Sequence, residues 1–99
     1  MARFDVYSNT NAPGFLVDVQ ADLLSALNTR MVVPLLPLEF APTPADGLNP
    51  VFEILGTGCS MVTQFMAAVP ARELKVPILN LERERSLILA AIDLLHQGW

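Results

Sequence analysis

Residues 3–20 read RFDVYSNTNAPGFLVDVQ, a stretch with two alternating segments on either side of a turn-rich one. In its first part apolar side chains alternate with polar ones, the period of two expected of a half-buried β-strand. Its last six residues, FLVDVQ, resume the alternation with Phe15, Val17 and Val19 on one side. The segment between them, SNTNAPG, is rich in turn formers. The sequence therefore predicts a β-hairpin with a long tip over residues 3–20.

The two segments after this hairpin differ in character. Residues 21–28, ADLLSALN, follow neither period, so we expect a connector with a helical turn in which the adjacent Leu23 and Leu24 cannot both be hidden on one face. Residues 29–38, TRMVVPLLPL, are apolar and β-branched, which predicts a strand. Its two prolines lack an N–H donor, so we expect an edge strand or one broken by a bulge.

The middle of the chain predicts a second hairpin. Residues 41–50, APTPADGLNP, have the composition of a surface loop. VFEIL (51–55) and CSMVTQFMAAV (59–69) indicate two strands joined by GTG, whose glycines can adopt positive φ. PARELKVPIL (70–79) is mixed, and we expect one more short strand at its end.

A helix over residues 81 to about 97 is the clearest element. Asn80 is the predicted N-cap, and Gly98 is of the residue type that stops a helix. Most of the circumference is apolar, which suits a helix packed on a sheet on one side and against a second subunit on another. Two adjacent rows at helical spacing make up this apolar surface: Ile88, Ala91, Ile92 and Leu95, and then Leu87, Ala90 and Leu94.

The composition indicates a single domain, residues 1–99, that buries a face against another subunit. Hydrophobic residues make up 53% of the chain, more than a domain of 99 residues easily hides. A membrane-spanning helix needs about 20 consecutive apolar residues, whereas the longest candidate, residues 86–95, contains Asp93. We therefore expect a homodimer, with no membrane contact and no signal peptide.

The charge and the cysteine content bound the partners and the compartment. The formal net charge is −4, with only six Lys and Arg residues. Nucleic-acid-binding proteins usually carry a basic patch, so direct contact with DNA or RNA is disfavoured and a protein partner is preferred. The one cysteine, Cys59, excludes an internal disulfide and fits a reducing cytoplasm.

The sequence predicts neither an enzyme nor a metal or cofactor site. His96 is the only histidine, and nothing around it resembles a nucleophile elbow. A zinc site needs more Cys and His than one of each. The GTGC segment lacks the Lys and Ser or Thr of a phosphate-binding loop.

Several segments, taken together and in order, resemble the CcdB family, the toxins of ccd toxin–antitoxin modules. The resemblance covers nearly the whole chain, and its most specific parts are VDVQADLL and the strand RMVVPL. The segments that carry it are FDVYSN, FLVDVQADLL, NTRMVVPLLPLE, AAVP and AAIDLLHQGW.

Membership of this family would imply a fold and a function. The implied fold is mainly β, a small SH3-like antiparallel β-barrel with an N-terminal hairpin and a C-terminal α-helix, in a homodimer. The implied function is non-enzymatic: such a toxin binds the A subunit of DNA gyrase and traps the complex in which DNA is cut. A CcdA-type antitoxin removes the toxin from gyrase through a flexible C-terminal segment, and the two together repress their operon, with the antitoxin contacting DNA.

The resemblance also implies a gyrase contact at the tip of the C-terminal helix, where the family usually ends Trp-Gly-Ile and its tryptophan stacks on an arginine of gyrase. Gly98 matches the glycine, Gln97 occupies the tryptophan position and Trp99 the isoleucine position. The ring is therefore shifted by two residues, about 200° around a helix and about 3 Å along it. The alternative for Trp99 is that it folds back and seals the core.

The antitoxin contact implied by the resemblance lies at Leu23 and Leu24, which match an aliphatic pair in the family's antitoxin groove, with Asp93 near the helix tip. The alternative for the two leucines is ordinary packing in the core or the dimer interface. The alternative for Asp93 is that it is simply solvated.

Two other functions stay open at this point. The departure from Trp-Gly-Ile favours a CcdB-like protein that has lost gyrase poisoning. A MazF-type ribonuclease toxin of the same fold would need a basic groove and a catalytic arginine beside a threonine or serine. Thr29 and Arg30 are the one suggestive pair, and the net charge argues against it.

Overall fold

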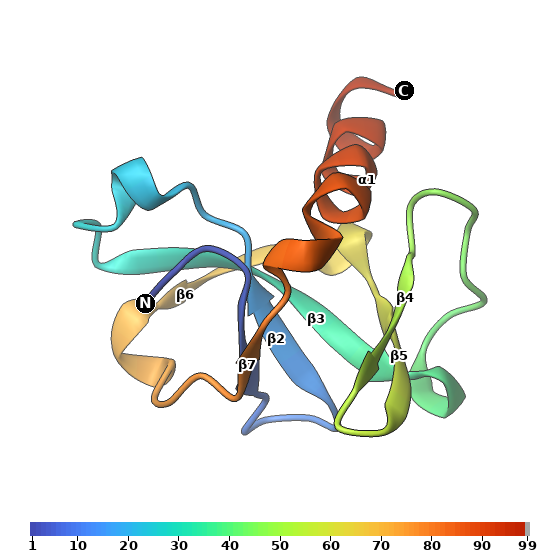
Figure 1. Ribbon diagram of the computed structural model, residues 1–99, viewed down its shortest axis with the longest axis horizontal. Helices are drawn as coiled ribbons and strands as arrows, with labels where there is room; N and C mark the ends of the chain where they lie inside the picture. The colour runs from blue at the N-terminus through green and yellow to red at the C-terminus, as the bar shows by residue number, and fades with distance from the viewer. Residues whose placement is uncertain (99) are drawn as a thin grey trace.

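The computed structural model describes residues 1–98, which form a seven-stranded antiparallel sheet and one C-terminal α-helix; Trp99 lies outside the described residues. The helix, α1, spans Arg85–Gln97. Figure 1 shows the sheet curled into a half-barrel, with α1 projecting from it. The strands are β1 (Asp5–Ser8), β2 (Phe15–Asp18), β3 (Thr29–Pro37), β4 (Val51–Ile54), β5 (Thr57–Met61), β6 (Ala67–Pro70) and β7 (Leu79–Asn80).

The mainly β, barrel-like fold with a C-terminal helix is thus confirmed, whereas the homodimer stays a prediction. The strand order is β4-β5-β3-β2-β1-β7, with β6 paired to β3. Five single 3-10 turns interrupt the connections: Asp22–Leu24, Leu38–Phe40, Thr63–Phe65, Ala71–Glu73 and Glu82–Glu84. The first of them is the helical turn expected within residues 21–28.

The predicted N-terminal hairpin is formed by β1 and β2, in which Val6 lies opposite Val17. Both valines are fully buried in the main core, which also includes Ile88 and Ala91 of α1. The expectation of a half-buried hairpin is wrong in one respect. Tyr7, on the other face of the sheet, is only 2% exposed, because a second cluster with Val32 and Leu74 covers that face.

Of the two alternatives for residues 29–38, an edge strand or a bulged one, the edge strand is wrong, because β3 lies in the centre of the sheet. It pairs with β2 along one edge, and along the other with β6 over its first half and β5 over its last residues. Pro34 is tolerated because it lies where β3 changes partner. Its carbonyl accepts a hydrogen bond from the Val62 N–H, just after β5. Its nitrogen, which carries no hydrogen, faces the same side of β3, in the gap between β5 and β6 where no donor is needed.

The second hairpin is confirmed for β4 and β5, but the strand expected over residues 59–69 is broken. Leu55 and Gly56 both have positive φ, +51° and +84°, the two-residue turn that suits the twist of a hairpin. After β5 the chain makes the 3-10 turn Thr63–Phe65 and then pairs with the opposite end of β3 as β6. Two short strands thereby satisfy one edge of the nine-residue β3.

The helix begins at Arg85, four residues later than expected, after the 3-10 turn Glu82–Glu84. Asn80 still caps this entry: its Oδ1 accepts a hydrogen bond of 2.7 Å from the Glu82 N–H. Gly98 ends the helix as predicted, with φ +84° and its N–H bonded to the Leu94 carbonyl. Within residues 1–98 no helix is both long and apolar enough to cross a membrane.

Candidate partner-binding surfaces

The carboxyl end of α1 is exposed and carries three of the predicted site residues that the structure describes. Asp93 and Gln97 lie one turn apart on α1, and both are exposed. Gly98 follows in the left-handed conformation, and a Cβ added to it would meet no atom within 4 Å. In Figure 1 this end of the helix stands clear of the sheet. The predicted role of Trp99 falls outside the described residues.

The connector between β2 and β3 exposes apolar side chains, including both leucines of the predicted antitoxin contact. Leu23 is 93% exposed and Leu24 48% exposed, and Leu27 is also exposed. Core packing within one chain is therefore not the role of Leu23. A group of apolar side chains held in solvent is typical of a protein-binding surface.

Gln20 holds this connector against the sheet. Its Nε2 donates to the Leu24 carbonyl at 2.9 Å, and its Oε1 accepts from the Met31 N–H at 3.0 Å. One side chain thereby joins a backbone group within the connector to a backbone group of β3. The exposed leucines consequently sit on a turn whose base is fixed, which lowers the entropy lost when a partner binds.

A buried ion pair lies beneath the base of the connector. Arg30 Nε donates to Asp18 Oδ2 at 2.7 Å, and Arg30 Nη2 lies 2.6 Å from the same oxygen. Both residues are 0% exposed. Asp18 Oδ1 accepts the Gln20 N–H at 3.0 Å, so the ion pair and the connector share one network. Burial raises the pKa of Asp18, opposed by the hydrogen bonds from Gln20 and Arg30.

The structure does not gather the three predicted antitoxin residues into one patch. In Figure 1 the turn with Leu23 and Leu24 projects from the sheet at a place separate from α1, which carries Asp93. Sequence reasoning also missed Asp18 and Gln20. The signal available was two polar residues within FLVDVQ, whose alternation places both opposite the valines.

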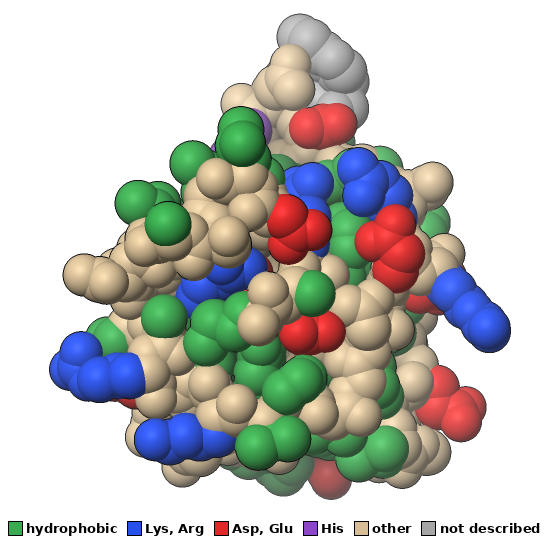
Figure 2. Space-filling view, turned by 60° about the vertical axis from the view of Figure 1, so that its left-hand side comes forward, with side chains coloured by type: hydrophobic (Ala, Val, Ile, Leu, Met, Phe, Trp, Pro, Cys, Tyr) green, Lys and Arg blue, Asp and Glu red, His purple; other side chains and the backbone are tan. Residues whose placement is uncertain are grey.

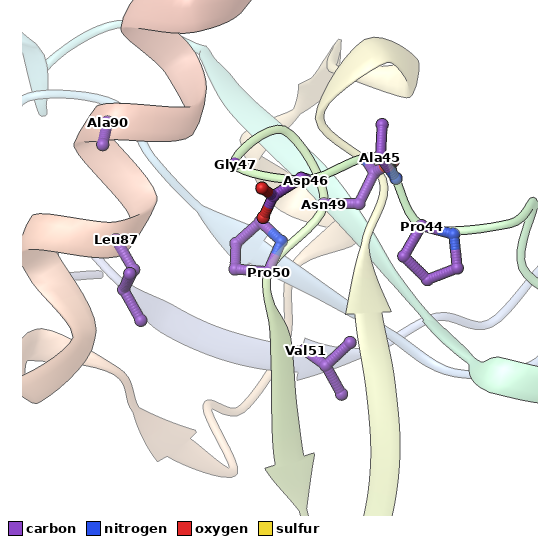
Figure 3. Close-up of a pocket in the computed structure, with 9 residues that line it drawn as sticks. All are labelled: Pro44, Ala45, Asp46, Gly47, Asn49, Pro50, Val51, Leu87 and Ala90. Carbon is purple, nitrogen blue, oxygen red and sulfur yellow. Dashed lines mark hydrogen bonds between the residues drawn. The ribbon is translucent and has the colours of Figure 1, made fainter.

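A cleft that the sequence did not predict lies between α1 and the loop that leads into β4 (Figure 3). Its volume is about 490 Å³. Leu87 and Ala90 form the helix side, and Asp46 is the one charged residue among those that line it in the described chain. The loop side and the start of β4 contribute Pro44, Ala45, Gly47, Asn49, Pro50 and Val51.

The loop wall of this cleft is fixed from behind. The buried Asn49 donates through Nδ2 to the Met61 carbonyl and to Gln64 Oε1, and its Oδ1 accepts the Ala45 N–H. Thr63 Oγ1 donates to the Leu48 carbonyl. The cleft is therefore preformed.

The described residues offer little for catalysis or metal binding. No group of three or more His, Cys, Asp or Glu within residues 1–98 is placed to hold a metal ion. Cys59 is buried, and burial raises the pKa of its thiol, which makes it a poor nucleophile. On the face drawn in Figure 2, Lys and Arg side chains form several separate groups with acidic side chains between them rather than one continuous stripe.

A comparison with protein families places the whole of this architecture in one of them. The family model described as CcdB protein matches residues 3–98. A search of curated proteins finds no match. The match spans every strand and the helix, up to the glycine that ends it. The chain therefore belongs to the CcdB family, toxins of toxin–antitoxin systems that act on DNA gyrase rather than as enzymes.

Proposed function

We propose that this chain, as a single domain over residues 1–99, is the toxin of a type II toxin–antitoxin module that binds the A subunit of DNA gyrase and traps the gyrase–DNA cleavage complex. The match to the CcdB family over residues 3–98 is the observation that carries the proposal. In this proposal the toxin acts in the cytoplasm as a homodimer. It needs no cofactor and does not contact nucleic acid itself.

The gyrase contact in this proposal is the helix tip, Gln97, Gly98 and Trp99. The exposed end of α1 supports it, because Gln97 and Gly98 are both accessible to a partner where the helix ends. An aromatic ring on a guanidinium is worth about 2 kcal/mol when the pair is desolvated. A two-fold dimer presents two such tips, which suits a two-fold partner.

Neutralisation by a CcdA-type antitoxin completes the proposal, through Leu23, Leu24 and Asp93. The exposure of both leucines supports a partner at the connector. The separation of the connector from α1 in Figure 1 implies that the antitoxin segment is long enough to reach two surfaces. Together the two proteins repress their operon, and the antitoxin supplies the DNA contact.

Binding of the purified chain to the purified A subunit of gyrase, measured by calorimetry, tests this proposal. We expect micromolar or tighter affinity for the wild type and a loss of about tenfold or more for Trp99→Ala, since tenfold corresponds to about 1.4 kcal/mol. Val76→Ala, an exposed apolar position away from the helix tip, is the control and leaves the affinity unchanged. A concentration of about 100 µM would detect even a weak affinity. Absence of binding by a folded wild type at that concentration would contradict the proposal.

A CcdB-like protein without gyrase poisoning is the second candidate, and the exposed Gln97 at the family's tryptophan position favours it. In that case neither the wild type nor Trp99→Ala binds gyrase. The ribonuclease alternative is disfavoured because Arg30 is buried against Asp18 and cannot reach an RNA phosphate.

A further inference from the structure

The cleft beside α1 borders a strand edge with unpaired backbone groups. β4 ends one side of the sheet, and among the described residues only β5 pairs with it. The Met61 N–H bonds to the Pro50 carbonyl, so residues 50, 52 and 54 direct their backbone groups toward β5. The N–H and C=O of Val51 and Glu53 therefore face away from β5. Figure 3 shows β4 between β5 and α1, so these groups face the helix side.

The helix opposite this edge presents an apolar surface that the core does not use. Leu87 is 53% exposed and Ala90 is exposed, whereas the next residue in each case, Ile88 or Ala91, is fully buried. At the carboxyl end of the helix the cleft is narrow, because a Cβ on Gly47 would lie 3.4 Å from Leu94 Cδ2. An unpaired strand edge facing an apolar helix stripe is the arrangement by which an extended peptide adds to a sheet.

The charge around the edge selects the occupant. Asp46 lines the cleft, and Figure 3 shows its carboxylate on the side of the loop that faces α1. Glu53 is exposed two residues after Val51, on the same face of β4. No Lys or Arg lines the cleft within the described part of the chain. These carboxylates favour a positively charged segment. They disfavour a second copy of this chain as the occupant, because its net charge is −4.

We propose that this cleft binds an extended, positively charged peptide segment of a partner protein, which adds as a strand to β4 and lays apolar side chains on Leu87 and Ala90. The hydrogen bonds come from the backbone of Val51 and Glu53, which makes binding tolerant of the peptide's sequence. The alternation of side chains along a strand then directs one row to the helix stripe and the other toward the acidic edge. This site does not depend on gyrase binding, and it is separate from the helix tip.

A labelled octapeptide of alternating lysine and valine is the probe that tests this inference, with fluorescence anisotropy for affinity and ¹⁵N chemical shifts for location. We expect saturable binding to the wild type, with shift changes at Val51, Glu53, Leu87 and Ala90. A glutamate–valine octapeptide binds at least tenfold more weakly, as does a lysine–valine peptide N-methylated at alternate residues, because one lacks the positive charge and the other the backbone donors.

Matched variants separate this cleft from other surfaces. Ala90→Arg fills the cleft with a cation at an exposed helix position and lowers the affinity at least tenfold, whereas Ala26→Arg, the same change at an exposed connector position, does not. Asp46→Asn with Glu53→Gln weakens binding several-fold at low salt, and Glu73→Gln on the other face of the sheet has no effect.

Three results would overturn the inference. One is the absence of binding by folded wild type at millimolar peptide. Another is a set of shift changes confined to the connector or to the opposite face of the sheet. The third is a wild-type dimer in sedimentation that Ala90→Arg dissociates, because a second copy of the chain would then occupy the cleft.

Discussion

Arg30 Nε and Asp18 Oδ2 lie 2.7 Å apart in the interior of the chain, with neither residue exposed. The pair joins β2 to β3 and, through the Gln20 N–H on Asp18 Oδ1, supports the base of the connector. Arg30 Nη1 has no hydrogen-bond acceptor among residues 1–98. A buried guanidinium that is not fully satisfied depends on its carboxylate, so the pair is sensitive to loss of either partner.

Removing one partner of this pair is the first prediction. Asp18→Asn or Arg30→Met is expected to lower the free energy of unfolding by about 3–5 kcal/mol, because each leaves a buried charge without its partner. Equilibrium urea unfolding measures the change. The double variant Asp18→Asn with Arg30→Met should lose less than the sum of the two single changes.

A surface ion pair provides the control for this experiment. Glu82 and Arg85 lie 3.6 Å apart, and both side chains are at least half exposed. Glu82→Gln should change the free energy of unfolding by less than about 1 kcal/mol. Equal losses at the two pairs would contradict the importance given to burial.

The second prediction concerns Tyr7, the only tyrosine in the chain. Burial raises the pKa of Tyr7 above its ordinary value near 10, and the Asp5 and Asp18 carboxylates add to the shift. Above pH 10 the unfolded chain therefore loses this proton before the folded chain does. The contribution of Tyr7 to the free energy of unfolding therefore stays constant from neutral pH up to about pH 10. It decreases as the pH rises further toward the raised pKa of the folded chain.

Tyr7→Phe should remove this alkaline loss and leave the protein equally stable, or up to about 1 kcal/mol more stable, at pH 7. The hydroxyl is buried and makes no hydrogen bond of normal geometry among the described residues, so its removal costs little. Absorbance at 295 nm follows ionisation of the single tyrosine, and urea unfolding from pH 7 to 11 follows stability. A folded-state titration at pH 10 or below would contradict the prediction.

The third prediction concerns the connector. Gln20→Ala should lower the free energy of unfolding by about 1–3 kcal/mol and speed amide exchange at Met31, since it leaves the Met31 N–H and the Leu24 carbonyl without their partner. Gln20→Glu keeps the acceptor for Met31 and loses only the donor to Leu24. Its effect on Met31 exchange should therefore be smaller, and equal effects would show that Gln20 does not bridge the two.

A pair of glycines yields the fourth prediction. Gly14 and Gly56 both have positive φ, +95° and +84°, so alanine is strained by about 1–2 kcal/mol at either position. At Gly14 the added Cβ would also come within 2.2 Å of the Leu35 carbonyl oxygen, whereas at Gly56 it meets nothing within 4 Å. Gly14→Ala should therefore lower the melting temperature clearly more than Gly56→Ala. Similar melting temperatures for the two variants would contradict the close approach at Gly14.

Local patterns predicted the hairpins, the terminal helix and the short strand at β7, because each is set by periodicity and turn residues within a few positions. The place of β3 could not be predicted in this way. Its prolines indicated an edge or a bulge, but the tertiary structure puts Pro34 where two partner strands meet. The break after β5 could not be predicted locally either. The chain leaves β3 there and pairs with its other end as β6, and this arrangement depends on the whole sheet.

The sequence pointed to exposed residues as the candidate site, and their binding roles stay predictions, whereas the buried network beneath the connector was missed. Leu23, Leu24, Asp93, Gln97 and Gly98 were all singled out, and those five are exposed. Asp18 and Arg30 lie on the strand face opposite Val17 and Val33, which an alternating pattern assigns to solvent. The segment around Leu74 covers that face, a long-range contact with no signal in the hairpin itself.

The central claim is most directly tested by incubating supercoiled plasmid with gyrase, with and without the purified protein, and scoring linear DNA after detergent and protease. We expect linear DNA to accumulate with the wild type, and far less with Trp99→Ala. A folded wild-type protein that leaves no cleaved DNA at micromolar concentration would contradict the account and identify the chain as a CcdB-family protein that does not poison gyrase.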